Sequence, residues 1–319
     1  MSTTAGGKPI CGMTWGWVGT RGTWQTPAAA TSMKRMAEHA VNWTALAYAA
    51  VQATPFSTDI PFGDEPTVTD EEIIHAIRAA HALGLKVCLK PVVNVADGTW
   101  RAHIGFFDWD VPGEPSWTEW FASYTRFILH AARIAESEGC EMLCIGCEMV
   151  RSDGQEAHWR ALVAAVREVY SGPITYNCDK YQEDRVTWWD AVDVISSSGY
   201  YPIDTWEVQL DRIEPVVRRF DKPFFFMEAG CPSREGSARL PNDWNLAGAP
   251  SGAEQLDYYR EMFRACRARS WVGGLMLWDW PADLYSEEQA AQNDDYCPYG
   301  KPAGQYMAEQ YRAWQKAAR

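Results

Sequence analysis

Short apolar runs and longer amphipathic segments alternate along most of the chain. Each apolar run has the length and composition of a buried strand, and the segments between the runs have the apolar spacing of helices. We therefore expect strands at residues 10–17, 42–48, 86–93, 142–148, 174–177, 192–200, 224–228 and 274–280.

Helix start and stop signals lie between these runs. Capping boxes, in which Ser or Thr is followed three residues later by Glu, open the helices before the third, fourth and eighth expected strands. The boxes are Thr69 with Glu72, Ser116 with Glu119, and Ser251 with Glu254. Three helices are expected to close at Gly84, near Gly139 and at Gly172. The first helix should begin at about Pro27, and the last should run from about Pro302 to the chain end.

The alternation of eight strands with helices predicts an α/β protein, a single (β/α)8 TIM barrel spanning residues 1–319. An open doubly wound sheet is the alternative, but no Gly-rich phosphate loop follows the first strand. Two long loops, at about 94–115 and 232–251, follow strand ends and should overhang the catalytic face. Residues 1–9 are expected to form a flexible tail.

Composition narrows the range of functions. The formal net charge of −13 argues against nucleic acid and anionic membranes as partners. The chain begins without an apolar leader, and several of its nine cysteines lie in expected buried strands. Both features indicate a cytoplasmic protein, or a secreted one if a leader had been removed. The 17 tryptophans exceed what a core of this size needs, so some could stack on sugar rings. The sequence makes no prediction of oligomeric state.

Two glutamates, Glu148 and Glu228, stand at the ends of apolar strands. A carboxylate is costly to bury there unless it has a use, and such a pair suggests a glycosidase. Barrel enzymes carry their site at the carboxyl ends of the strands. The other residues at these ends are polar or aromatic: Trp15, Trp17, Lys90, Asn94, Asn177, Asp179, Tyr200, Trp278 and Asp279. This ring contains no familiar zinc set, and we expect no metal or organic cofactor.

Several segments resemble glycoside hydrolase family 113 of the glycosidase clan A, whose best-known members are β-mannanases. They are Gly-Met-Thr-Trp-Gly-Trp (12–17), Leu-Lys-Pro (89–91), Ile-Gly-Cys-Glu (145–148), Phe-Met-Glu-Ala-Gly (226–230) and Gly-Lys-Pro-Ala (300–303). The resemblance implies a retaining β-glycosidase with Glu148 as acid/base and Glu228 as nucleophile. Glu148 has to carry a proton when the leaving oxygen departs, whereas Glu228 has to stay ionised.

The same resemblance implies roles for the surrounding side chains. Tyr200 would donate a hydrogen bond to the nucleophile, and Trp278 would form the floor for the sugar at the cleavage point. Lys90 and Asn177 would bind sugar hydroxyls. Many clan members have Asn where this chain has Cys147, and mannanase relatives tend to have His where it has Val92. The first expectation for the substrate is a β-1,4-linked mannan or manno-oligosaccharide. The alternatives are xylo-, gluco- or galacto-configured sugars, or a non-catalytic carbohydrate-binding barrel.

Overall fold

Eight parallel strands close into a barrel in the computed structural model of the protein, which describes residues 7–317. Each strand pairs with the next along the chain, and the last pairs with the first. The strands are β1 (Ile10–Trp15), β2 (Trp43–Gln52), β3 (Lys86–Val95), β4 (Met142–Cys147), β5 (Ile174–Cys178), β6 (Val194–Gly199), β7 (Phe224–Ala229) and β8 (Val272–Trp280). The predicted (β/α)8 barrel is confirmed.

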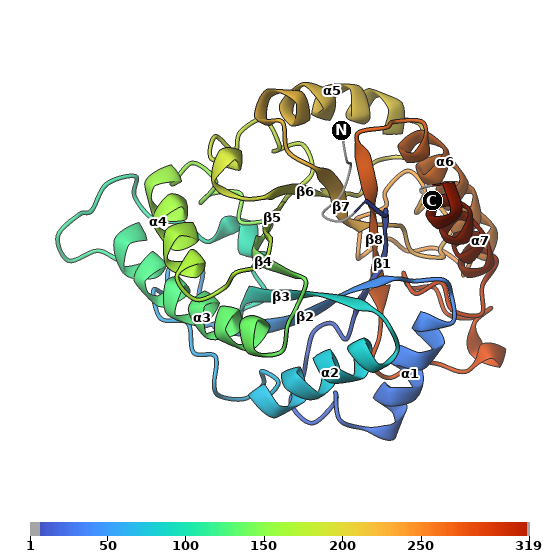
Figure 1. Ribbon diagram of the computed structural model, residues 1–319, viewed down its shortest axis with the longest axis horizontal. Coiled ribbons are helices and arrows are strands. Elements are labelled where there is room, and N and C mark those ends of the chain that lie inside the picture. The colour runs from blue at the N-terminus through green and yellow to red at the C-terminus, as the bar shows by residue number, and fades with distance from the viewer. Residues whose placement is uncertain (1–6, 318–319) are drawn as a thin grey trace.

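Helices surround the barrel, with α1 and α2, α3 and α4, α5, and α6 and α7 following one another around it (Figure 1). Their bounds are α1 (Pro27–Ala37), α2 (Asp70–Ala82), α3 (Trp117–Ser137), α4 (Glu156–Arg167), α5 (Trp206–Phe220), α6 (Gly252–Arg267) and α7 (Pro302–Ala317). Short 3₁₀ turns lie at η1 (Arg101–His103), η2 (Trp189–Ala191) and η3 (Glu287–Gln289). None of the helices within residues 7–317 is long and apolar enough to cross a membrane.

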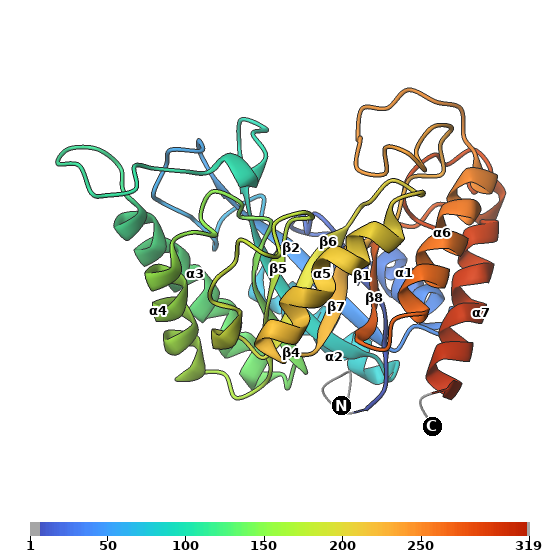
Figure 2. The same ribbon diagram turned by 90° about the horizontal axis from the view of Figure 1, so that it is seen from above.

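The long loops after β3 and β7 rise on opposite sides of one end of the barrel, away from both chain ends (Figure 2). The carboxyl ends of the strands point to this end, so both loops overhang it, as predicted. Pro9 is buried, and its carbonyl accepts a hydrogen bond from Asn42 Nδ2 at 3.1 Å. The expected flexible tail therefore does not extend to Pro9, and its residues 1–6 lie outside the described part of the chain.

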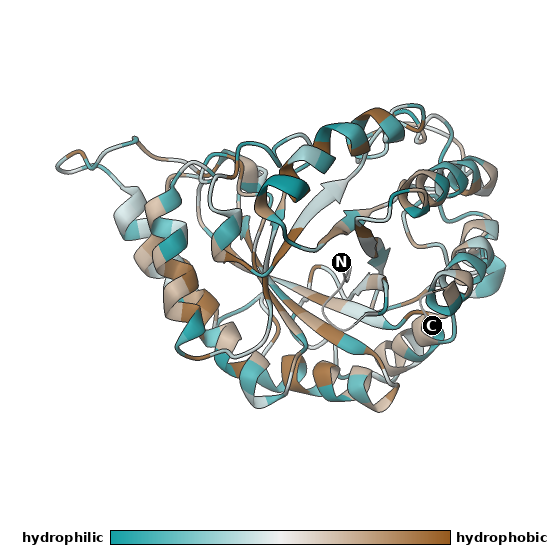
Figure 3. Ribbon diagram, turned by 45° about the horizontal axis from the view of Figure 1, so that its top comes forward, coloured by the Kyte–Doolittle hydropathy of each residue, from teal (hydrophilic) through white to brown (hydrophobic). Residues whose placement is uncertain are grey.

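Apolar side chains form two layers, one inside the barrel and one between strands and helices. Trp43, Cys88 and Met276 belong to the inner layer. The outer layer is much larger and contains most of the buried tryptophans. Hydrophobic residues accordingly concentrate on the strands and on the inward sides of the helices (Figure 3). A parallel sheet covered on both faces needs such strands, which explains why the apolar runs were visible in the sequence. All nine cysteines are buried with free thiols.

Two of the three predicted capping boxes are complete. Thr69 and Ser116 each accept from the backbone N–H three residues on, and the glutamates there accept from the cap N–H in return. The third box forms only its first half, since Ser251 Oγ accepts from the Glu254 N–H at 3.3 Å. The Glu254 carboxylate instead accepts from backbone N–H groups at 236 and 238 in the β7–α6 loop, both at 3.0 Å. Glu254 therefore ties this loop to the start of α6.

The strands that carry the predicted pair of glutamates both contain an irregularity of register. In β7 the pairing with β6 shifts between Ser197 and Ser198, where Glu228 enters the ladder directly after Phe226. In β4 the pairing with β5 shifts between Cys144 and Cys147. A Cβ at Gly146 would lie 2.8 Å from Trp159 of α4, so position 146 faces the helices. Bulges of this kind re-aim side chains next to active sites.

Candidate active site

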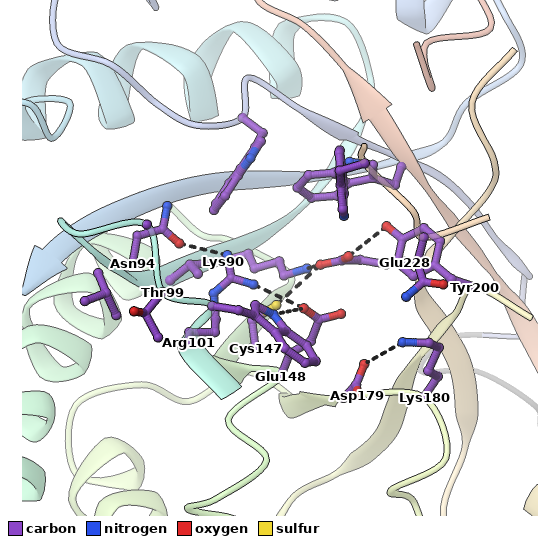
Figure 4. Close-up of a pocket in the computed structure, with 18 of the residues that line it drawn as sticks. Lys90, Asn94, Thr99, Arg101, Cys147, Glu148, Asp179, Lys180, Tyr200 and Glu228 are labelled. Carbon is purple, nitrogen blue, oxygen red and sulfur yellow. Dashed lines mark hydrogen bonds and ion pairs between the residues drawn. The ribbon is translucent and has the colours of Figure 1, made fainter. Parts of the chain in front are cut away.

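A cavity of about 640 Å³ lies at the carboxyl ends of the strands. Both predicted glutamates line it, together with five of the seven other predicted site residues: Trp17, Lys90, Asn94, Tyr200 and Trp278. The close-up in Figure 4 shows Glu148 and Glu228 facing the same space from β4 and β7. The barrel thus brings together side chains that are up to 261 positions apart in the sequence, from Trp17 to Trp278.

Glu228 is a buried carboxylate surrounded by donors. Its Oε1 forms an ion pair with Lys90 Nζ, and its Oε2 accepts from the Tyr200 hydroxyl at 2.8 Å. The Cys147 thiol lies 3.4 Å from Oε1 and donates to it. Burial by itself would raise the pKa of Glu228, but the Lys90 ammonium, the charge of Arg101 and the Tyr200 hydrogen bond hold that pKa below its usual value. Glu228 is therefore ionised at neutral pH.

Asn177 lies beneath the cavity and is absent from its lining. Its Oδ1 accepts from Lys90 Nζ at 2.8 Å, and its Nδ2 donates to Ser198 Oγ at 3.0 Å. The predicted contact of Asn177 with a sugar hydroxyl is therefore corrected, because its amide is already occupied and covered. The side chain instead orients Lys90 toward Glu228.

Glu148 sits directly after β4 with a backbone φ of +53°, in the left-handed region that a non-glycine residue rarely adopts. Strained backbone of this kind persists where the surroundings hold it, often at functional sites. Its Oε1 accepts from Ser198 Oγ at 2.8 Å. Its Oε2 accepts from Arg101 Nη1 at 3.1 Å and from Trp100 Nε1 at 3.3 Å. Three side chains, one from β6 and two from the loop after β3, thus hold this carboxylate in one orientation.

Arg101 and Trp100 were not among the predicted site residues. Both lie in the long loop after β3, where hydrophobic periodicity carries no information on the path of the chain. Arg101 is fixed by Asn94, whose Oδ1 accepts from Nη2 at 2.8 Å, and by the Val93 carbonyl at 3.2 Å. Its guanidinium lies over the Trp17 ring, 5.4 Å from the centroid. The signal for them in the sequence was the adjacent pair of Trp100 and Arg101 shortly after the third expected strand.

Trp15 and Trp17, both expected at the end of the first strand, do not face the same space. β1 ends at Trp15, and Gly16 adopts a φ of +83°, so strand alternation stops between the two residues. Trp15 packs in the layer beneath the helices, where its Nε1 donates to Ser32 Oγ of α1 at 3.2 Å. Trp17 turns into the cavity and packs edge-on against Trp278, with centroids 5.4 Å apart.

The second long loop adds a further aromatic wall. Trp244 lines the cavity, is 56% exposed, and packs against Tyr296 at a centroid distance of 4.7 Å. It was missed because it lies in the 232–251 loop, although a tryptophan between Asp243 and Asn245 was visible there. Aromatic faces beside polar groups suit the binding of sugar rings.

Charges in the cavity occur as neighbouring pairs of opposite sign. Each of three carboxylates has a basic side chain within 4 Å, which limits the cost of burying both. The pairs are Lys90 with Glu228, Arg101 with Glu148, and Lys180 with Asp179. Two carboxylates on facing strands, held by donors among aromatic walls, are the arrangement of a glycoside hydrolase.

Comparisons with known proteins agree with this class. The sequence pattern of Glycoside Hydrolase Family 113 matches residues 13–301. The chain belongs to glycoside hydrolase family 113. A search of curated proteins gave no match.

Three solved structures are similar over nearly the whole chain. A GH113 β-1,4-mannanase is 54% identical, with a TM-score of 0.95 over 96% of this chain and 99% of that one. A complex of a GH113 β-1,4-mannanase is 53% identical, with a TM-score of 0.94 and the same coverage. The β-mannanase AaManA from Alicyclobacillus acidocaldarius, in complex with ManMIm, is 46% identical, with a TM-score of 0.95 over 98% of this chain and 100% of that one.

Proposed function

We propose that the protein hydrolyses β-1,4-linked mannan or manno-oligosaccharides with retention of anomeric configuration. The observation that carries the proposal is the unequal setting of two glutamates in one cavity. Glu228 is held ionised by Lys90 and Tyr200, as a nucleophile requires. Glu148 lies across the same cavity at the end of β4. The choice of mannan is supported by the β-1,4-mannanases that the chain resembles at 46–54% identity.

The reaction proceeds in two displacements. Glu228 attacks the anomeric carbon while Glu148 gives its proton to the glycosidic oxygen, which leaves with the rest of the chain. A water molecule then attacks the same carbon of the glycosyl-enzyme. Glu148, now a carboxylate, takes the proton of that water and Glu228 leaves as a carboxylate. Each step inverts the anomeric carbon, so the product has the configuration of the substrate.

Neighbouring side chains support these steps. Tyr200 binds one oxygen of Glu228 and Lys90 pairs with the other, so the carboxylate is held in one orientation at the cavity. Trp278 and Trp17 form an aromatic corner in the cavity wall, suited to the apolar face of a sugar ring. Lys90 compensates the charge of Glu228 and is itself positioned by Asn177. Val92 and Cys147, where relatives tend to have other residues, both line the cavity, and the Cys147 thiol also donates to Glu228.

The test is a hydrolysis screen on β-1,4-linked manno-, gluco- and xylo-oligosaccharides and on aryl β-glycosides. We expect the highest kcat/KM on the manno series. Proton NMR of the first-formed product should show the β-anomer before mutarotation. A first-formed α-anomer would contradict the two-displacement mechanism, and a higher kcat/KM on gluco- or xylo-oligosaccharides would contradict the assignment to mannan.

A further inference from the structure

Two cavity residues take no part in the mechanism above. Asp179 and Lys180 directly follow β5 and line the cavity next to Glu148 (Figure 4). Asp179 is only 6% exposed, and its Oδ1 has no hydrogen-bond donor within the described residues. The Lys180 ammonium lies 3.6 Å from that oxygen, which is an ion pair but too long for a hydrogen bond.

An unsatisfied carboxylate oxygen is costly in a buried position. Lys180 offsets the charge of Asp179 without donating a hydrogen bond to it, so the carboxyl group and the ammonium each keep capacity for a further hydrogen bond. The free space next to this pair is the cavity itself. A ligand that fills the cavity can supply a donor to this carboxyl group, and a sugar hydroxyl can both donate to Asp179 and accept from Lys180.

The turn that presents the pair is firmly held. Tyr181 adopts a φ of +68° and packs against Tyr201 with centroids 5.4 Å apart. Two residues further on, Glu183 is fully buried and accepts from Ser197 Oγ at 2.6 Å and from Tyr201 OH at 2.8 Å. Arg212 of α5 completes this network with an ion pair to Glu183 at 2.6 Å. A preorganised turn of this kind is what a specific binding contact requires.

The position of the pair indicates which sugar it would contact. The Glu148 N–H donates to the Asn177 carbonyl at 2.8 Å, and Asp179 follows Asn177 by two residues at the end of β5. Asp179 therefore lies in the same cavity beside the residue that protonates the leaving oxygen (Figure 4). The sugar attached to that oxygen has to lie on the Glu148 side of the bond that breaks.

We propose that Asp179 and Lys180 form a binding subsite for the leaving sugar, with the carboxyl group and the ammonium contacting neighbouring hydroxyls of that ring. The subsite rests on the proposed function, because its position is defined by the role of Glu148. Its ligand is the non-reacting sugar of an oligosaccharide, or a sugar acceptor that takes the place of water in the second displacement.

The experiment compares two substrates in Asp179→Asn and Lys180→Met variants. One substrate is a β-1,4-mannotetraose, which places a sugar in the subsite, and the other is an aryl β-mannoside, whose leaving group has no hydroxyls. We expect kcat/KM on the tetraose to fall at least about 10-fold further than on the aryl mannoside, as for a lost hydrogen bond to a charged group. Lys180→Arg should recover part of the loss, because it keeps the positive charge.

Asp184→Asn is the matched control, since Asp184 is exposed on the same loop, and it should leave both rates unchanged. Thermal unfolding of each variant separates a binding loss from a folding loss. Equal losses on the two substrates would overturn the subsite, and so would an unchanged rate on the tetraose. If the wild-type protein hydrolyses neither substrate, the proposed function itself fails, which is a different result from either of these.

Discussion

At the scale of single residues, one lysine decides the charge state of the proposed nucleophile. Glu228 and Lys90 are both buried, and burying either charge would be costly without the opposite charge beside it. Burial would raise the pKa of Glu228, and the ammonium of Lys90 is the largest influence that lowers it. Removing that ammonium should therefore let the pKa of Glu228 rise.

We predict that Lys90→Met lowers kcat on manno-oligosaccharides roughly 100-fold or more, the range seen when a preorganised charge partner is lost. The acidic limb of the kcat/KM profile should also move to higher pH, because Glu228 then takes up a proton more readily. Lys86→Met is the control, since Lys86 is exposed at the other end of the same strand. Full activity of Lys90→Met with an unshifted acidic limb would refute this role for Lys90.

Sequence reasoning located the strand-end residues but not all of their partners. Lys90, Tyr200 and Trp278 line the cavity as expected, because a strand end fixes where its side chains go. Arg101 and Trp100 were missed because they reach Glu148 from a loop whose path has no periodic signal. The catalytic roles of Glu148 and Glu228 stay predictions that mutation can test.

At the scale of elements, the irregular registers of β4 and β7 are central to the site. Phe226 packs against Trp206 of α5, and Met227 lies inside the barrel. Strict alternation would then turn Glu228 back toward the helices. The register shift beside Glu228 lets it face the cavity instead. Alternation in the sequence could not predict this, because a bulge changes the face without changing the apolar pattern.

Glu254 offers a test of how the β7–α6 loop is held. We predict that Glu254→Ala exposes the backbone N–H groups of Gly236 and Ala238, which the carboxylate now binds. Hydrogen exchange in the 232–251 loop should speed up at least about 10-fold at these amides, as expected for a lost bond to a charged acceptor.

The control for this prediction is Ser251→Ala, which removes only the helix cap and should cost about 1 kcal/mol of stability. Its loop amides should keep the protection of the wild type. Equal protection in Glu254→Ala and the wild type would show that the carboxylate does not hold the loop.

At the scale of the whole molecule, the barrel and the family followed from the sequence because both depend on features spread along the entire chain. Apolar runs, capping boxes and strand-end residues all indicated the same fold. The third predicted capping box forms only in part, because the Glu254 carboxylate accepts from backbone N–H groups of the β7–α6 loop instead of from the cap N–H. Tertiary partners of this kind are chosen by the folded structure and leave no local signal.

The molecule also buries carboxyl groups whose ionisation should make stability depend on pH. Burial raises the pKa of Asp153 and of Asp179 to about 7, and that of Asp279 to about 8. The folded state therefore binds more protons than the unfolded state between about pH 4 and pH 8, so stability falls as pH rises through this window.

We predict that Tm is lower at pH 8 than at pH 5 by roughly 5 °C or more, measured by calorimetry. Asp153→Asn should reduce this difference, because it removes one of the raised groups while keeping an acceptor for Tyr176. Asp64→Asn, at an exposed position, should keep the wild-type difference. A Tm that rises from pH 5 to pH 8, or an unchanged difference in Asp153→Asn, would contradict the prediction.

The most direct test of the central claim is the configuration of the azide products formed by the two glutamate variants from an activated aryl β-mannoside. In Glu228→Ala, azide takes the place of the nucleophile and attacks from the α face, so the account predicts an α-mannosyl azide. In Glu148→Ala, Glu228 still forms the glycosyl-enzyme, and azide attacking from the opposite face should give the β-mannosyl azide. A β-azide from Glu228→Ala, or the same anomer from both variants, would contradict the assigned roles.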